Sequence, residues 1–157
     1  MSLQSEEEAR AAVELRSNAI TVDEYLALRK RVGWKQLTRL QAETALANSI
    51  VTIGAYLADQ PIGMGRLVGD RAVICYVQDL IIPPQAQGYG VGSVLLKWLV
   101  EYAESMRIPG TELMLDLMCA KGREGFYAQH GFIARPTEKL GPGMIQYLVP
   151  GEEENRK

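Results

Sequence analysis

Three segments in the middle of the chain have the composition of β-strands. They are short, rich in β-branched and aromatic side chains, and separated by turns: residues 49–57, 62–68 and 72–82. Pro83 and Pro84 end the third segment, because neither residue can donate a hydrogen bond to a neighbouring strand. The pattern predicts an antiparallel meander of three strands.

Helical periodicity appears on both sides of this meander. Thr21 and Glu24 form a capping-box pattern, which predicts a helix over residues 22–31, and a second helical stretch is expected over residues 35–47. The clearest helix begins near Gly92. Its apolar side chains recur at helical spacing on one stripe: Leu95, Leu96, Leu99, Tyr102, Ala103 and Met106.

Shorter elements complete the predicted architecture. Strands are expected at residues 11–16, 112–118, 132–135 and 143–149, and a short helix at residues 123–130. The strand–helix–strand order over residues 72–118 implies parallel pairing there. The fold class is therefore mixed α/β (α+β), in one domain of 157 residues.

Composition narrows the functional classes. Hydrophobic residues make up 47% of the chain and charged residues 23%, which is typical of a globular protein. The net charge is −2, so the chain has no broad positive field that would attract nucleic acid or an anionic membrane. No apolar run reaches the length of a membrane span, and the acidic N-terminus differs from a signal peptide. Cys75, Cys119 and the one histidine, His130, have no metal-site spacing. We therefore expect a cytoplasmic protein that holds no metal.

The most informative segment is a glycine-rich turn between a strand and a helix. Gly88, Gly90 and Gly92 permit positive φ angles, so that successive amide groups can form a concave nest for phosphate at the helix N-terminus. The GxGxG spacing differs from both the dinucleotide-binding and the P-loop patterns. Glycines also allow close packing at such a corner, so both interpretations stay open for the turn alone.

Two motifs resemble those of the GNAT superfamily, the N-acetyltransferases that use acetyl-coenzyme A (acetyl-CoA). Residues 85–90 (QAQGYG) resemble its Gln/Arg-x-x-Gly-x-Gly/Ala signature, and residues 126–132 (FYAQHGF) resemble its FYxxxGF segment. The order of the predicted elements also agrees, and the resemblance covers residues 12–149. It implies a central twisted sheet of about six or seven strands that splays near the glycine turn.

The resemblance implies where acetyl-CoA binds. Phe126 belongs to the segment that closes the acyl site, and Leu80 and Ile82 correspond to the positions beside which the pantetheine arm runs. Ala120 and Arg123 depart from the family pattern, which leaves in doubt an amide contact to that arm. The pyrophosphate is expected on the main-chain amides of Gln87, Gly88, Tyr89, Gly90, Val91, Gly92 and Ser93.

Two residues are candidates for the chemistry. By resemblance, Tyr127 is the acid that protonates or hydrogen-bonds the departing thiolate; otherwise it is a half-buried aromatic residue. Asp79 interrupts an apolar strand end and has two interpretations: it anchors or deprotonates a substrate ammonium group, or it pairs with an arginine or caps a turn. Alternation places it on one face with Val77 and Cys75 unless a β-bulge intervenes.

Other side chains receive weaker assignments. Trp34 is either a wall of the acceptor pocket or a core anchor, and Tyr76 is a weaker candidate to line that pocket. His130 is expected to complement a helix dipole, and the basic residues 29–31 to form a solvated helix end. A structural role is favoured for Asp116, and core positions for both cysteines.

These observations predict transfer of an acetyl group from acetyl-CoA to a primary amine of a small molecule or peptide by direct attack. The alternative within the same fold is a non-catalytic sensor that binds coenzyme A, and a nucleotide-binding α/β domain is a more distant rival. Neither nucleic acid nor a membrane is an expected partner. The last predicted strand, residues 143–149, is apolar enough to pair with a second copy of the chain.

Overall fold

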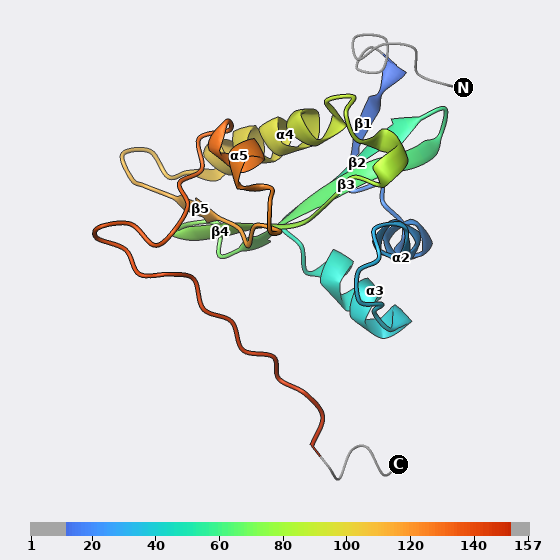
Figure 1. The fold of residues 1–157 in the computed structure, drawn as a ribbon. Coiled ribbons are helices and arrows are strands. Elements are labelled where there is room, and N and C mark those ends of the chain that lie inside the picture. The colour runs from blue at the N-terminus through green and yellow to red at the C-terminus, as the bar shows by residue number, and fades with distance from the viewer. Residues whose placement is uncertain (1–11, 152–157) are drawn as a thin grey trace. The chain divides into compact units, whose positions relative to one another are not determined.

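The computed structural model describes residues 12–151, and the acidic N-terminal segment, the start of the first predicted strand and most of the charged tail lie outside the described residues. The chain forms two compact units that divide between Leu117 and Met118. The first unit contains a sheet with helices on both faces, and the second contains one short helix (Figure 1).

Within residues 12–151 the sheet has five strands in the order β1-β2-β3-β4-β5, and neighbouring strands are antiparallel except for β4 and β5, which are parallel. The predicted meander and the parallel pairing are confirmed. The strands are β1 (Glu14–Ser17), β2 (Val51–Leu57), β3 (Gln60–Gly69), β4 (Ile74–Ile81) and β5 (Met114–Asp116).

Capping boxes begin the two helices that lie between β1 and β2 in the chain. In α2 (Val22–Arg31), the Thr21 hydroxyl accepts from the amide of Glu24 and the Glu24 carboxylate accepts in return from the amide of Thr21. Helix α3 (Arg39–Ala47) starts later than expected because Thr38 and Gln41 form a second capping box. The others are the short η1 (Pro84–Ala86), α4 (Val91–Met106) and α5 (Glu124–Ala128). None of the helices among residues 12–151 is long and apolar enough to cross a membrane.

Helices cover both faces of the sheet in the first unit (Figure 1). Helix α4 crosses one face, where its side chains at positions 95, 96 and 99 are fully buried, and α2 and α3 cover the other. The α2 face has its own apolar cluster: Ile20, Tyr25, Leu28, Ala42, Tyr56, Met64 and Ile81.

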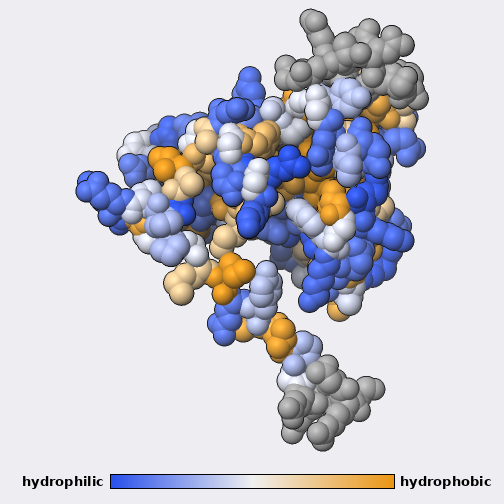
Figure 2. Space-filling model, viewed as in Figure 1, coloured by the Kyte–Doolittle hydropathy of each residue, from blue (hydrophilic) through white to orange (hydrophobic). Residues whose placement is uncertain are grey.

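In the part of the chain that the structure describes, the sheet has five strands, fewer than the six or seven expected. Residues 132–135 and 143–149 belong to no strand. Hydrophobic side chains along the C-terminal segment are therefore exposed (Figure 2), and Met144 and Leu148 have exposed fractions of 88% and 90%. A strand exists only as part of a ladder, and among the described residues no neighbouring backbone pairs with either segment. Pairing of residues 143–149 with a second copy stays a prediction.

Candidate functional site

The glycine turn joins β4 to α4 through the single turn of η1. Gly88 and Gly90 have φ angles of 83° and 75°, and Gly90 is the N-cap residue of α4. A β-carbon at Gly88 would meet no atom within 4 Å, so its glycine serves the left-handed backbone and not close packing. At this position the structure favours the conformational interpretation of the turn.

The first turn of α4 presents amide groups toward this bend. The amides of Val91, Gly92 and Ser93 lie in the first turn of α4, where no carbonyl of the helix is placed to accept from them. Gly90, the N-cap residue, has no side chain that could accept from them either. The positive end of the helix dipole adds to their attraction for anions. The turn therefore has the backbone geometry of an anion site.

Gln87 has a different position from its neighbours in the turn. Its amide donates to the carbonyl of Pro84 at 3.2 Å, and its side-chain Nε2 donates to the carbonyl of Ile82 at 2.8 Å. The residue thus ties the turn to the end of β4, and the amides that remain available to an anion begin at Gly88.

A β-bulge lies in β4 just before the turn. Gln78 pairs with Arg66 and Ile81 pairs with Met64, so Asp79 and Leu80 together lie opposite the single residue Gly65. Asp79 has a left-handed φ of 53°. The bulge corrects the simple alternation: the Asp79 side chain faces α2, whereas Val77, before the bulge, lies on the α4 face.

The Asp79 carboxylate is the centre of a buried polar cluster. Its side chain is 0% exposed, and those of Arg29 and Arg66 are 11% and 12% exposed. Oδ1 accepts from Arg29 Nη1 at 2.8 Å and from Gln78 Nε2 at 3.2 Å, and Oδ2 accepts from Arg66 Nε at 2.8 Å and from the Tyr25 hydroxyl at 2.5 Å. Arginine pairing, one of the two interpretations of Asp79, is what the structure shows.

Electrostatics keep the Tyr25 hydroxyl in the cluster as a donor, although the buried Nε of Arg29 has no hydrogen-bond partner among the described residues. Burial raises the pKa of the Tyr25 hydroxyl, and the hydrogen bond to Asp79 raises this pKa further, so Tyr25 remains a donor at neutral pH. Arg29 also donates to the carbonyl of Lys35 at 2.9 Å, and its guanidinium lies 5.4 Å from the ring centroid of Trp34. The expectation that residues 29–31 form a solvated helix end is wrong for Arg29.

Pairing between β4 and β5 ends before the turn. Their described ladder covers only Ile74–Tyr76 with Met114–Asp116, so the edge of β4 from Val77 onward has no β5 partner. Leu80 and Ile82, predicted to lie beside the pantetheine arm, are half-buried in this stretch. The ladder therefore ends before the glycine turn, and the expected splay of the two strands stays a prediction.

Both predicted acceptor-side aromatic residues are half-buried. Trp34, in the connection from α2 to α3, packs against the α2-face cluster, so its core-anchor role is observed. Tyr76 lies in β4 between Val68 of β3 and Asp116 of β5. A pocket-lining role for either residue stays a prediction.

The second unit holds the aromatic motif. The Tyr127 ring packs edge-on against Phe126 at 5.1 Å and against Phe132 at 5.9 Å, between centroids. His130 Nδ1 donates to the carbonyl of Phe126 at 2.8 Å, in agreement with its assignment to the end of α5. A general-base role for His130 would require the other ring nitrogen.

The cysteines differ in burial. Cys75 is fully buried, as expected, and burial raises the pKa of its thiol. Cys119 is exposed, so its predicted core position is wrong. Desolvation raises the pKa of the Cys119 thiol as well, which disfavours the reactive thiolate.

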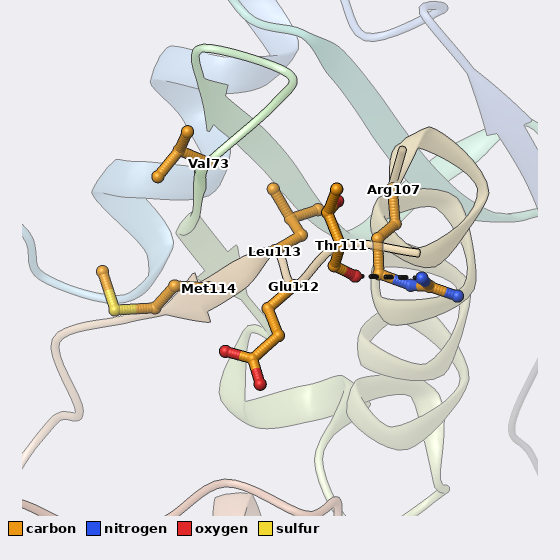
Figure 3. Close-up of a pocket in the computed structure, with 6 residues that line it drawn as sticks. All are labelled: Val73, Arg107, Thr111, Glu112, Leu113 and Met114. Atoms are coloured by element: carbon orange, nitrogen blue, oxygen red, sulfur yellow. Dashed lines mark hydrogen bonds between the residues drawn. The ribbon is translucent and has the colours of Figure 1, made fainter. Parts of the chain in front are cut away.

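An open depression of about 760 Å³ lies at the far end of α4 (Figure 3). Arg107 borders it and donates to the carbonyl of Thr111 at 3.0 Å. Helix α4 has 16 residues and is therefore about 24 Å long, so this depression is remote from the glycine turn. Its lining residues are Val73, Arg107, Thr111, Glu112, Leu113 and Met114.

Sequence reasoning missed the partners of Asp79. Arg66 is a single charge inside the apolar β3, and Asp79 is a single charge inside the apolar β4. Opposite lone charges in neighbouring antiparallel strands are a signal for a buried ion pair. That signal could have identified Arg66, whereas nothing local distinguishes Tyr25 or Arg29.

Comparison with known proteins agrees with these features. The sequence model of the acetyltransferase (GNAT) domain family matches residues 48–134, just over half of the chain. An N-acetyltransferase from Prochlorococcus marinus, described as ycf52-like, is 28% identical over 69% of this chain and 61% of its own length. The chain spans 54% to 63% of the curated relatives that it matches.

Solved structures give the same result. A GNAT-family acetyltransferase from Streptococcus pneumoniae TIGR4 is 28% identical, with a TM-score of 0.74 over 88% of this chain and 99% of that one. Glucosamine-6-phosphate N-acetyltransferase from Arabidopsis thaliana is 11% identical, with a TM-score of 0.66 over 87% of this chain and 99% of that one. The second likeness concerns the fold alone.

Proposed function

The chain belongs to the GNAT acetyltransferase family, and we propose that it is an acyltransferase that moves an acetyl group from acetyl-CoA to the primary amine of a small molecule or peptide. The observation that carries the proposal is the turn from β4 into α4, where Gly88 and Gly90 adopt positive φ at the start of a 16-residue helix. Such a nest suits the pyrophosphate of coenzyme A.

The proposed cofactor site extends along β4. The amides from Gly88 to Ser93 hold the pyrophosphate, and Gln87 acts as the brace that fixes this loop to Ile82. Beyond Tyr76 the edge of β4 has no β5 partner, and main-chain groups of Leu80 and of Ile82, just after the strand, would contact the pantetheine arm. An amide donor beside the thioester carbonyl would stabilise the developing oxyanion, a contribution worth about 3–4 kcal/mol.

The chemistry is direct attack of a neutral amine on the thioester. The amine nitrogen bonds to the acetyl carbon and releases one proton to water, the carbon–sulfur bond breaks, and the thiolate takes a proton. We assign this last proton to the Tyr127 hydroxyl, with Phe126 in the segment that closes the acyl site and with Trp34 and Tyr76 on the acceptor side.

Turnover separates an enzyme from a sensor. The experiment measures release of free coenzyme A thiol from acetyl-CoA across a panel of primary amines: polyamines, amino sugars, amino acids and short peptides. We expect amine-dependent release for at least one class. Tight binding of acetyl-CoA without release for any class would instead establish the coenzyme A sensor.

Calorimetry tests the nest with a matched pair of glycines. Gly88 and Gly110 have φ angles of 83° and 80°, and a β-carbon would meet no atom within 4 Å at either position. Alanine imposes the same backbone strain at both, but only Gly88 lies in the turn. We expect Gly88→Ala to weaken coenzyme A binding and Gly110→Ala to leave it unchanged; equal affinities would reject the nest.

Tyr127→Phe tests the proposed acid. The substitution keeps the ring and its packing against Phe126 and Phe132 while it removes the hydroxyl. We expect kcat to fall by about 10²–10⁴ with little change in coenzyme A affinity. Wild-type turnover would remove Tyr127 from the mechanism.

A further inference from the structure

The acceptor capacity of Asp79 is already filled. An ionised carboxylate has about four lone-pair positions, and here they receive hydrogen bonds from Tyr25, Arg29, Arg66 and Gln78. A general base needs a free lone pair directed at the substrate amine or at a water. With its side chain 0% exposed, Asp79 offers no such position.

The same contacts hold the backbone at the bulge. Asp79 is one of the few non-glycine residues with positive φ, a conformation that persists when the surroundings determine it. Its four donors come from α2, β3 and β4, so they fix the side chain from three directions. The next residue, Leu80, is thereby directed to the α4 face, where its Cδ1 lies 3.4 Å from the position of a β-carbon at Gly65.

The cluster also reaches the connection between α2 and α3. Arg29 bonds Asp79 with Nη1 and the carbonyl of Lys35 with Nη2, while its guanidinium lies over the ring of Trp34. One guanidinium therefore joins the bulge of the strand to the segment assigned to the acceptor side. All of these groups belong to the first unit.

We propose that Asp79 is a positioning residue: with Tyr25, Arg29 and Arg66 it fixes the main chain at Leu80 and Ile82 relative to the Trp34 segment, and so sets the thioester against the attacking amine. The inference rests on the proposed acetyl transfer, in which those two segments hold the two substrates. It assigns Asp79 no contact with either substrate and no proton in the reaction.

Asp79→Asn tests the inference by kinetics. The amide is nearly isosteric, but its NH2 group places a donor against the donors of the cluster, and the substitution removes the charge that pairs with both guanidinium groups. Misplacement of reacting groups by about 1 Å can cost about 10²-fold in rate, and we expect a fall in kcat of that order. The acidic limb of the pH profile of kcat/KM should stay at its wild-type position, because Asp79 is not the base.

Arg29→Lys separates the contact of Arg29 with Asp79 from its contact with the Lys35 carbonyl. Lysine keeps the charge beside Asp79 but cannot also reach the Lys35 carbonyl with a second, planar donor. We expect KM for the amine to rise while KM for acetyl-CoA stays near wild type. Asp23→Asn is the matched control, because Asp23 lies on the same helix and pairs with Arg39 at the exposed surface.

Hydrogen exchange provides a readout that does not depend on turnover. Amides of residues 80–82 and 34–36 should exchange faster in Asp79→Asn and in Tyr25→Phe, which removes one donor only, than in Asp23→Asn. Wild-type exchange at both segments would overturn the inference, as would loss of the acidic limb in Asp79→Asn or unchanged kinetic constants with only a lower Tm. If wild-type protein releases no thiol with any amine, the proposed function fails instead, and hydrogen exchange still decides whether the cluster fixes these segments.

Discussion

The two faces of the sheet in the first unit are packed by different forces. On the α4 face, Gly63 and Gly65 lie directly beneath fully buried leucine side chains, and the contact is apolar. On the α2 face, an apolar cluster surrounds Asp79 and its two arginines. Apolar packing is non-directional, whereas a filled set of charge-assisted hydrogen bonds fixes orientation. The directional contacts are on the face that carries the proposed acceptor segment.

The largest expected effect comes from removing the charge at the centre of the α2 face. Asp79→Ala leaves the guanidinium groups of Arg29 and Arg66 buried together without a counter-charge. Breaking a buried ion pair in this way costs about 3–5 kcal/mol of unfolding free energy. Urea denaturation measures the loss, and a loss of less than about 1 kcal/mol would show that the cluster is not a stabilising part of this face.

A smaller effect comes from one neutral donor on the same face. Tyr25→Phe removes a hydrogen bond to a carboxylate, which is worth about 1.5–3 kcal/mol, and keeps the buried ring. The pKa of Tyr25 is raised in the folded protein, first by burial and then by Asp79. The contribution of Tyr25 to the unfolding free energy is therefore fully present below pH 10, the ordinary pKa of a tyrosine being about 10, and it is lost as pH rises through the higher pKa of the folded protein.

Unfolding free energies of wild type and Tyr25→Phe, measured by urea denaturation from neutral to alkaline pH, check this sign. The difference between the two proteins should be constant up to about pH 10 and should shrink above it. A difference that grows above pH 10 would mean that the folded protein prefers the phenolate, contrary to the geometry.

The stability of the α4 face should depend on side-chain volume and not on charge. A β-carbon at Gly65 would lie 2.7 Å from Leu99 Cδ1, so Gly65→Ala forces that side chain to move. Overpacking of this kind costs about 1–3 kcal/mol, and the flexible end of Leu99 places it near the lower end. Leu99→Val should cost less in the Gly65→Ala background than alone, because it vacates the space that the new methyl group needs. Additive losses would refute the contact.

Sequence alone predicted what is local. Helix α2 has the expected bounds because Thr21 and Glu24 lie three residues apart and cap it by themselves. The glycine turn is predictable for the same reason, because its closely spaced glycines lie between a strand and a helix that are themselves evident in the sequence. The second capping box, at Thr38 and Gln41, is equally local, and it starts α3 at Arg39 and not at the expected residue 35.

What sequence could not predict depends on distant partners. Arg29 and Asp79 are separated by 50 positions, and neither residue carries a local mark of the other. The bulge at Asp79 reverses the face of every later residue in β4, so alternation counted from Val77 gives the wrong side. Residues 143–149 have strand composition, but composition does not supply the neighbouring strand that a ladder requires.

The smallest expected effect sharpens the comparison, because it concerns an arginine–aspartate pair of nearly the same length at the exposed surface. Arg39 Nη1 lies 2.7 Å from Asp23 Oδ1 and Arg29 Nη1 lies 2.8 Å from Asp79 Oδ1, but the side chains of Arg39 and Asp23 are 61% and 79% exposed. Water solvates the charges of Arg39 and Asp23 in both the folded and the unfolded protein, and salt screens the attraction between them. Asp23→Asn should therefore leave the urea midpoint unchanged within error at low and at high salt. A loss comparable to that of Asp79→Ala would show that distance, and not burial, governs the energy of these arginine–aspartate pairs.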